Sequence, residues 1–257
     1  IYIKNGWTPI DTEDDEIEMK KAKRRKQIAK ENKERRPKYI DMEKNIIHFD
    51  RINSTNAYGL EHFEKLSHGD VILTDLQLKG RGRFDRVWSG NFSDDIYMSI
   101  IIKPENRDFP FPNLTQYLSV VTNRVINRDY GVKSNIKWPN DILFEGKKLA
   151  GILSEGKIIN NNLAGVVLGI GVNVNRDVFN NLPNAVSLKN IIGKTVDKKV
   201  LIDKILEDFF KGYDEFALKG FSSIMEEYKV MCKFNDGKLK LTASFNDGEY
   251  VFERINS

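Results

Sequence analysis

The sequence has few cysteines and histidines, the residues from which metal and redox sites are usually built. Its 257 residues include one cysteine, Cys232, and three histidines, His48, His62 and His68. A single cysteine excludes an intramolecular disulfide and a cysteine-bound metal cluster, and the histidines show no metal-ligand spacing. No apolar run approaches the roughly 20 residues that a membrane-spanning helix requires, and the first residues lack the pattern of a signal peptide. These absences favour a cytoplasmic enzyme and argue against a membrane protein.

Net charge is also small, +4 at neutral pH, and it is unevenly distributed. Residues 1–45 carry 13 Lys or Arg against 10 Asp or Glu, while residues 46–257 carry 28 against 27. The globular part therefore lacks the basic excess expected of a general nucleic-acid surface. Residues 12–36 have too few apolar positions for an amphipathic stripe, so we expect a solvated helix or a disordered arm there. An arm that contacts nucleic acid or a partner is the alternative.

Apolar periodicity indicates an α+β chain. We expect strands where apolar and β-branched residues cluster, and helices where apolar residues recur three and four positions apart. The expected strands cover residues 45–51, 71–75, 96–102, 136–144, 148–156 and 163–175, and the expected helices cover 113–130 and 198–218. In the tail, Asn235-Asp236-Gly237 and Asn246-Asp247-Gly248 are typical of hairpin turns. We divide the chain into a charged extension, 1–44, a main domain, 45–226, and a small β module, 227–257.

One loop combines residues that bind anions. Gly80–Trp88 reads G-R-G-R-F-D-R-V-W. Glycines let the backbone approach a ligand closely, and arginines donate bidentate hydrogen bonds to phosphate or carboxylate. The tryptophan can cover a flat ring or keep water from reactive chemistry. The loop therefore predicts a site for a polyanion that carries an aromatic base, such as a nucleotide.

Four further segments carry polar residues near strand ends, and each has a structural alternative. Ser54-Thr55-Asn56 follows the first strand and is also explained as a helix N-cap. Lys137-Trp138-Pro139-Asn140-Asp141 could bracket a magnesium-bound phosphate, or form a turn with a surface ion pair. Lys148 precedes Gly151 by three residues and could contact a carboxylate or phosphate, or be an exposed hairpin lysine. Gly169–Asn173 lacks the third glycine of a dinucleotide fingerprint; its Asn could recognise adenine, or its glycines could mark a bulge.

In this order, the five segments resemble the catalytic domain of biotin protein ligases. That family carries a strand-end S-T-N, a G-R-G-R-x-G-R-x-W loop, a K-W-P-N-D turn, a K-x-x-G-(I/L)-L strand and a G-x-G-x-N strand. The corresponding segments here are Ser54–Asn56, Gly80–Trp88, Lys137–Asp141, Lys148–Leu153 and Gly169–Asn173, within a similarity that covers about residues 45–220. The resemblance implies a mixed or antiparallel sheet flanked by helices, similar to class II aminoacyl-tRNA synthetases, and then a small, shortened SH3-like module.

The resemblance also implies an activity. Such enzymes join biotin to ATP with magnesium, forming biotinyl-5′-AMP and pyrophosphate, and then transfer biotin to one lysine of a biotin carboxyl carrier domain. An exposed sheet edge often pairs two subunits or docks the acceptor, so a homodimer is compatible with the resemblance. The partners implied are this carrier domain and a second copy of the chain, without nucleic acid or membrane.

Residue roles follow from the same resemblance. Biotin would contact Ser54, Thr55, Asn56, Gln77, Gly80, Arg81, Lys148, Gly151 and Leu153. ATP and the adenylate would contact Arg83, Arg86, Trp88, Lys137, Asn140 and Asn173. The catalytic residues would be Lys148, Arg83 and Asp141. Lys148 would contact the biotin carboxylate and the α-phosphate, Asp141 would serve magnesium and orient the acceptor lysine, and Trp88 would pack on the adenine side.

The chain departs from the family pattern in the loop. Asp85 stands where the family has glycine, and Ser89–Ser93 replaces the family's S-P-x-G. We therefore expect an active enzyme whose loop orders differently. A lipoate–protein ligase, which shares the fold, is one alternative function. A biotin-responsive DNA-binding regulator is another, although residues 1–44 show no helix-turn-helix pattern.

Overall fold

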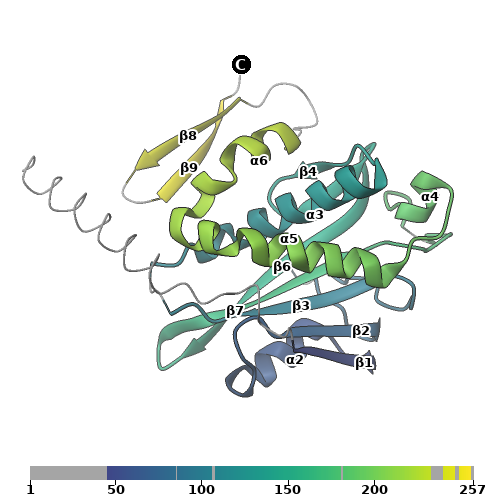
Figure 1. The fold of residues 1–257 in the computed structure, drawn as a ribbon, viewed down its shortest axis with the longest axis horizontal. Helices are drawn as coiled ribbons and strands as arrows, with labels where there is room; N and C mark the ends of the chain where they lie inside the picture. The colour runs from purple at the N-terminus through teal and green to yellow at the C-terminus, as the bar shows by residue number, and fades with distance from the viewer. Residues whose placement is uncertain are drawn as a thin grey trace, which may run out of the picture. The chain divides into compact units, whose positions relative to one another are not determined.

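The computed structural model describes residues 45–84, 86–105, 108–180, 182–232, 240–246 and 249–255. The chain divides after Met42 into two units, and the charged arm expected at 1–44 lies outside the described residues. The second unit contains a seven-stranded sheet in the order β1-β2-β3-β7-β6-β5-β4 (Figure 1). Strands β1 and β2 are parallel, and the other neighbouring pairs are antiparallel. This mixed sheet with its helices confirms the predicted α+β class.

The elements of the second unit follow in chain order. The strands of the sheet are β1 Ile46–Ile52, β2 Val71–Gln77, β3 Ile96–Ile102, β4 Asn135–Lys137, β5 Asp141–Phe144, β6 Lys147–Ile159 and β7 Asn162–Val172. The α-helices are α2 Thr55–Glu61, α3 Leu114–Tyr130, α4 Leu188–Ile192, α5 Lys198–Lys219 and α6 Met225–Met231, and the short 3-10 helices are η2 Phe63–Lys65, η3 Phe111–Asn113 and η4 Gly220–Ser223. None of the helices within the described ranges is long and apolar enough to cross a membrane.

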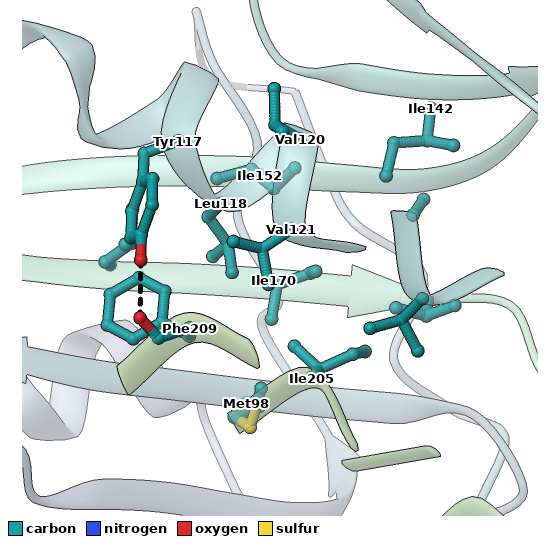
Figure 2. Close-up of a cluster of buried hydrophobic side chains, with 14 of the residues drawn as sticks. Met98, Tyr117, Leu118, Val120, Val121, Ile142, Ile152, Ile170, Ile205 and Phe209 are labelled. Carbon is teal, nitrogen blue, oxygen red and sulfur yellow. Dashed lines mark hydrogen bonds between the residues drawn. The ribbon is translucent and has the colours of Figure 1, made fainter. Parts of the chain in front are cut away.

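Helices α3 and α5 pack on one face of the sheet and form the larger core (Figure 1). Helix α5 carries an apolar stripe, because its buried residues recur three and four positions apart, whereas α3 is buried on all sides from Gln116 to Asn123. Figure 2 shows part of this core, with Val121 of α3, Ile152 of β6, Ile170 of β7 and Ile205 of α5. Burying one such side chain contributes about 1.5–3 kcal/mol. The layer therefore holds β6 and β7 firmly, and these strands carry much of the site described below.

Helix α2 packs on the opposite face, against β2, β3 and β7. Phe63, Ile72, Ile101 and Val167 form the small core beneath it. Gly59 allows the close approach, because a Cβ there would lie 2.9 Å from a methyl carbon of Val167. The N-terminus of α2 is thereby brought over β3 and β7.

The hairpin turn predicted at Glu145-Gly146 is confirmed. Both residues are left-handed, with φ of 48° and 80°, as a two-residue turn between twisted strands requires. The single strand predicted at 136–144 is wrong. A turn at 138–140 separates β4 from β5, and Lys137 lies opposite Asp141. Pro139 has no amide hydrogen for a strand ladder, which explains the interruption.

The C-terminal region agrees in part with the expected module. Helix α6 contacts α3 and η4 and crosses the predicted boundary at 226–227. Strands β8, Lys240–Asn246, and β9, Glu249–Ile255, pair antiparallel with Asn246 opposite Glu249, as the second Asp-Gly predicted. The first Asp-Gly, at 236–237, lies outside the described residues. The SH3-like class of this module stays a prediction.

His68 gives the protein an expected pH dependence of stability. Its Nδ1 accepts a hydrogen bond from the Lys103 amide at 2.9 Å, which requires an unprotonated nitrogen. Burial lowers the pKa of His68 below its usual 6.5, with Glu105 opposing in part. The unfolded chain then binds a proton near pH 6.5, whereas the folded chain binds it only at lower pH. The free energy of unfolding should therefore fall as the pH drops below about 6.5.

Urea unfolding at about pH 7.5 and about pH 5.5 measures this loss. His68→Asn is the control, because its side-chain oxygen can still accept from Lys103 but does not titrate. The variant should lose less stability than the wild type over this interval. Equal losses would contradict the assignment to His68.

Candidate active site

The arginine–glycine loop between β2 and β3 folds back on itself as a short hairpin. The Trp88 amide donates to the Gly80 carbonyl at 3.0 Å, and the Gly82 amide donates to the Arg86 carbonyl at 2.7 Å. Arg83 and Arg86 both line the cavity that the hairpin covers. The predicted phosphate-binding arginines are therefore on one wall of a cavity.

The glycine at the base of the hairpin has a packing role. A Cβ at Gly80 would lie 2.4 Å from the Trp88 carbonyl oxygen and 2.9 Å from Gln77 Nε2. Gly80 lets the hairpin close, and it lines neither of the cavities described here. At the tip, Phe84 is left-handed, with φ of 55°, and is largely exposed. Asp85, the departure from the family pattern, lies outside the described residues.

The first cavity has a volume of about 180 Å³ and a polar end. The Thr55 amide and hydroxyl lie 2.9 and 3.2 Å from Gln77 Oε1. Ser54 caps α2, because its hydroxyl accepts from the Ala57 amide at 3.4 Å. The cap interpretation is thus confirmed, yet Ser54 and Thr55 also line the cavity. One segment both starts the helix and supplies polar groups to the site.

Buried polar groups continue from this end. Ser99 Oγ, in the middle of β3, lies 2.7 Å from Thr55 Oγ1 and 2.6 Å from Asn56 Oδ1. Asn56 Nδ2 reaches the Leu153 carbonyl at 3.3 Å. A Cβ at Gly169 would lie 2.2 Å from Asn56 Oδ1, so Asn56 fits only above a glycine. Sequence reasoning missed Ser99, although a small polar residue within the apolar run 96–102 was an available signal.

The indole of Trp88 lies across the glycines of β6 and β7. A Cβ at Gly171 would lie 2.3 Å from Trp88 Cε2, and one at Gly151 would lie 2.8 Å from Cζ3. Gly151 lies directly opposite Gly171, and Leu153 opposite Gly169, so the alternative of a bulge at Gly169–Asn173 is wrong. These glycines, Gly151, Gly169 and Gly171, form a groove that we call the glycine stripe. Trp88 itself lines both cavities.

Lys148 and Asp141 stand where the two cavities meet, since both line each of them. Their side chains form an ion pair of 2.7 Å between Nζ and Oδ1. Lys148 Nζ also lies 5.2 Å from the centre of the Trp88 ring. The Lys148 amide donates to the Asn184 carbonyl at 2.7 Å, and its carbonyl accepts from the Val186 amide at 3.0 Å. A cation is thus held at the junction by a fixed backbone, unlike an exposed hairpin lysine.

The second cavity has a volume of about 420 Å³ and is lined in part by apolar side chains, including Phe179 and Leu182. Lys137 and Asn173 also line it. Asn173 Nδ2 lies 3.1 Å from the Lys148 carbonyl and 3.2 Å from that of Val186. These bonds hold the strand end beside the junction, and recognition of adenine by Asn173 stays a prediction.

The hairpin contacts the turn that precedes β5. Arg83 Nη1 lies 3.5 Å from Asn140 Oδ1, and Asn140 Nδ2 donates to the Ile152 carbonyl at 2.9 Å. Apart from Gly80, every predicted site residue lines at least one of the two cavities. The first cavity is also lined by three predicted biotin contacts, Arg81, Gly151 and Leu153. The five sequence segments therefore converge in space.

A buried ion pair that the sequence did not indicate secures the stem of the hairpin. Arg176 and Asp95 approach to 2.7 Å, with 7% and 2% of their side chains exposed. Asp95 also accepts from the Val174 amide at 2.8 Å, and Arg176 donates to the Ser89 carbonyl at 3.3 Å. Arg176 lies over the ring of Phe92 at 5.2 Å. The residues that follow Trp88 are thereby tied to the end of β7.

Filling the glycine stripe should move Trp88. Gly171→Ala places a methyl group inside the indole, so we expect Trp88 to leave the groove and its fluorescence emission to shift to longer wavelength. Emission spectra of the unliganded variant and wild type measure this. The control is the same substitution in a Trp88→Phe background, which should leave the spectrum of the remaining tryptophans unchanged. An unshifted Gly171→Ala spectrum would contradict the seating of Trp88.

Comparison with known proteins shows to which family the chain belongs. The sequence profile of the biotin/lipoate A/B protein ligase family matches residues 48–173. The biotin–[acetyl-CoA-carboxylase] ligase of Paracoccus denitrificans is 30% identical over 184 residues, which cover 68% of this chain and 75% of that protein. This chain belongs to the biotin protein ligase family. The fold class predicted from that resemblance agrees with the sheet observed.

Two further members of the biotin protein ligase family are similar to the chain. The bifunctional ligase/repressor BirA of Bacillus subtilis is 34% identical over 190 residues, which cover 71% of this chain but only 58% of that protein. The biotin protein ligase of Aquifex aeolicus, solved in complex with biotin and ATP, superposes with a TM-score of 0.67 at 26% identity. That superposition covers 82% of this chain and 86% of the Aquifex chain.

Proposed function

We propose that the protein activates biotin with ATP to biotinyl-5′-AMP and then transfers biotin to a lysine of a biotin carboxyl carrier domain. The observation that carries this proposal is Lys148, a cation at the junction of a small cavity with a polar end and a larger, more apolar one. Two ligands that react with each other need such a shared point. Family membership supports the assignment, as does the complex of the Aquifex aeolicus relative with biotin and ATP.

Biotin would occupy the first cavity. Its ureido group, which both donates and accepts hydrogen bonds, suits the cluster of Ser54, Thr55 and Gln77. Its sulfur ring and chain suit the part of this cavity that is lined by the apolar Leu153 and by Trp88. The carboxylate would then point to Lys148 at the far end. ATP would take the second cavity, with its α-phosphate also at Lys148. Arg83, Arg86 and Asn140 line only the first cavity, so they would reach the phosphates from the other side of the junction.

The first step brings together two anions. A carboxylate oxygen of biotin attacks the α-phosphorus of ATP, the bond to the β-phosphate oxygen breaks, and pyrophosphate leaves with the electron pair. Lys148, Arg83 and Arg86 offset the repulsion, and fixed cations in a partly dry site do so better than water. The product is a mixed anhydride that water would hydrolyse. The hairpin and Trp88 would limit that loss by covering the cavity.

Magnesium fits the donor set at the junction. Among the described residues that line the cavities, Asp141 is the one carboxylate, and magnesium–nucleotide sites commonly use one or two carboxylates with phosphate oxygens. The ion would supply further neutralisation of the phosphates. Asp141 would also orient the acceptor lysine, whose amine attacks the biotin carbonyl and displaces AMP.

A transfer assay tests the proposal. The protein, biotin, ATP and magnesium are incubated with a biotin carboxyl carrier domain, and mass spectrometry should show one added biotinyl group that requires ATP. Calorimetry with biotin and with lipoate separates this function from a lipoate ligase, because only biotin should bind. Absence of both transfer and ATP–pyrophosphate exchange would refute the proposal.

A further inference from the structure

Glu155 lies just outside the first cavity and contacts two residues that line it. It is on β6, on the same face as Gly151 and Leu153, because alternate residues of a strand share a face. Neighbouring strand β5 pairs with β6 only as far as Gly151, so Glu155 stands beyond that partner. Its side chain is 22% exposed. The carboxylate is therefore placed between the sheet and the hairpin above it.

The carboxylate of Glu155 joins two different parts of the molecule. Oε2 accepts from Asn56 Nδ2 at 2.7 Å, and Asn56 also contacts Ser99 and fills the space above Gly169. Arg81, at the base of the hairpin, places Nη2 3.1 Å from Oε1 and 3.4 Å from Oε2, so Oε2 is shared between the two partners. Asn56 belongs to a buried polar network, and Arg81 belongs to the loop.

The contact with Arg81 is the weaker of the two. The Arg81 side chain is 47% exposed, and breaking an ion pair this exposed changes an equilibrium constant at most about 5-fold. Such a pair opens and closes readily at ambient temperature, which suits a loop that must admit and release ligands. The contact between Asn56 and Glu155, within a network that is largely buried, does not need to open. Glu155 is thus held in place by Asn56 and forms an ion pair with Arg81 that can break and re-form.

We propose that Glu155 is a positioning residue that holds the hairpin closed through Arg81 and so retains the activated intermediate. This rests on the proposed function and adds a residue to it. Glu155 touches no reacting atom, so its loss should change retention and biotin affinity rather than the chemical step. Replacing it should accelerate escape of biotinyl-AMP about 3- to 5-fold, and raise KM for biotin by a similar factor, with kcat for pyrophosphate exchange unchanged.

The test is a double-mutant cycle of Glu155→Gln and Arg81→Gln. Glutamine keeps the size of Glu155 and one acceptor for Asn56, but it removes the charge that attracts Arg81. If both residues act through one contact, the double variant should lose biotinyl-AMP no faster than either single variant. Glu215→Gln is the matched control, since it removes an exposed ion pair with Lys219 on α5 and should change nothing.

A second measurement does not depend on activity. Trypsin cleaves after Arg83 and Arg86, so nicking of the unliganded hairpin, followed by mass spectrometry, reports how often it opens. Glu155→Gln should be nicked faster than the wild type, at an unchanged melting temperature. Unchanged nicking and unchanged adenylate escape, or additive effects in the cycle, would overturn the role of Glu155. A wild type that forms no biotinyl-AMP would instead refute the proposed function, while the nicking result would still report on the contact.

Discussion

Replacing Lys148 with alanine should lower the rate of biotinyl-AMP formation by roughly 10²- to 10³-fold, the cost of removing one fixed group that stabilises developing charge. ATP–pyrophosphate exchange measures this step directly. Lys148 offsets the repulsion between the biotin carboxylate and the α-phosphate in the proposed reaction. Lys148 Nζ lies 2.7 Å from Asp141 Oδ1. Without Lys148, the unpaired carboxylate of Asp141 would add to the repulsion between the biotin carboxylate and the phosphates of ATP.

The fold should survive this substitution. Lys148 is held through its backbone, by hydrogen bonds to Asn184 and Val186, and alanine keeps both. Lys147 is the matched control, because it is the neighbouring lysine, is exposed and lines neither cavity. Lys147→Ala should retain exchange activity within about 2-fold. Equal losses in the two variants would indicate a general charge effect and would contradict the role of Lys148.

Replacing Asp95 with alanine should lower the free energy of unfolding by about 3–5 kcal/mol. The cost arises because Arg176 would remain buried without its counter-charge, and the Val174 amide would lose its acceptor. Burial raises the pKa of Asp95, although Arg176 and the Val174 amide oppose this. Burying the two charges therefore costs free energy, and removing one partner while the other stays buried costs more. Urea unfolding of the variant and wild type measures the difference.

Two further variants separate this effect from a general loss of surface charge. Asp177 pairs with Lys189 at 2.8 Å but is 62% exposed, so Asp177→Ala should cost less than about 1 kcal/mol. The double variant Asp95→Ala, Arg176→Met should be less destabilised than Asp95→Ala alone, because no buried charge remains. If the loss of unfolding free energy in the double variant equalled the sum of the losses in Asp95→Ala and Arg176→Met, the two residues would be shown to act independently.

Local signals predicted most of the fold. The apolar run 96–102 became a strand buried along its whole length. The Glu145-Gly146 turn formed as predicted, with Gly146 in a left-handed conformation that glycine adopts without steric cost. The prediction of one strand over 136–144 was wrong for a reason that also lies in the local sequence. Pro139 lacks the amide hydrogen that a strand ladder needs, and the strand is interrupted there. Helix α6 was not predicted, because its seven residues are too few to display a clear period.

The site was predictable where its residues lie in motifs and hidden where they do not. Lys148 and Asp141 belong to recognisable segments, and the structure joins them in an ion pair. Asp95 and Arg176 are 81 positions apart in the chain, and nothing in either local sequence indicates that they meet. The contact between Arg81 and Glu155 spans 74 positions in the same way. Such pairs depend on strand order in the sheet, which local periodicity does not report.

The glycine stripe has a consequence for how this protein can change over generations. Asn56 occupies the space that a side chain at position 169 would need, and Trp88 occupies the space at position 171. A library of all single substitutions, selected for a working site, should therefore reject even alanine at both glycines. Variants that gain a side chain there should survive only together with a smaller residue at the facing position. We therefore expect a substitution at either glycine to be accepted only with a compensating change at Asn56 or Trp88.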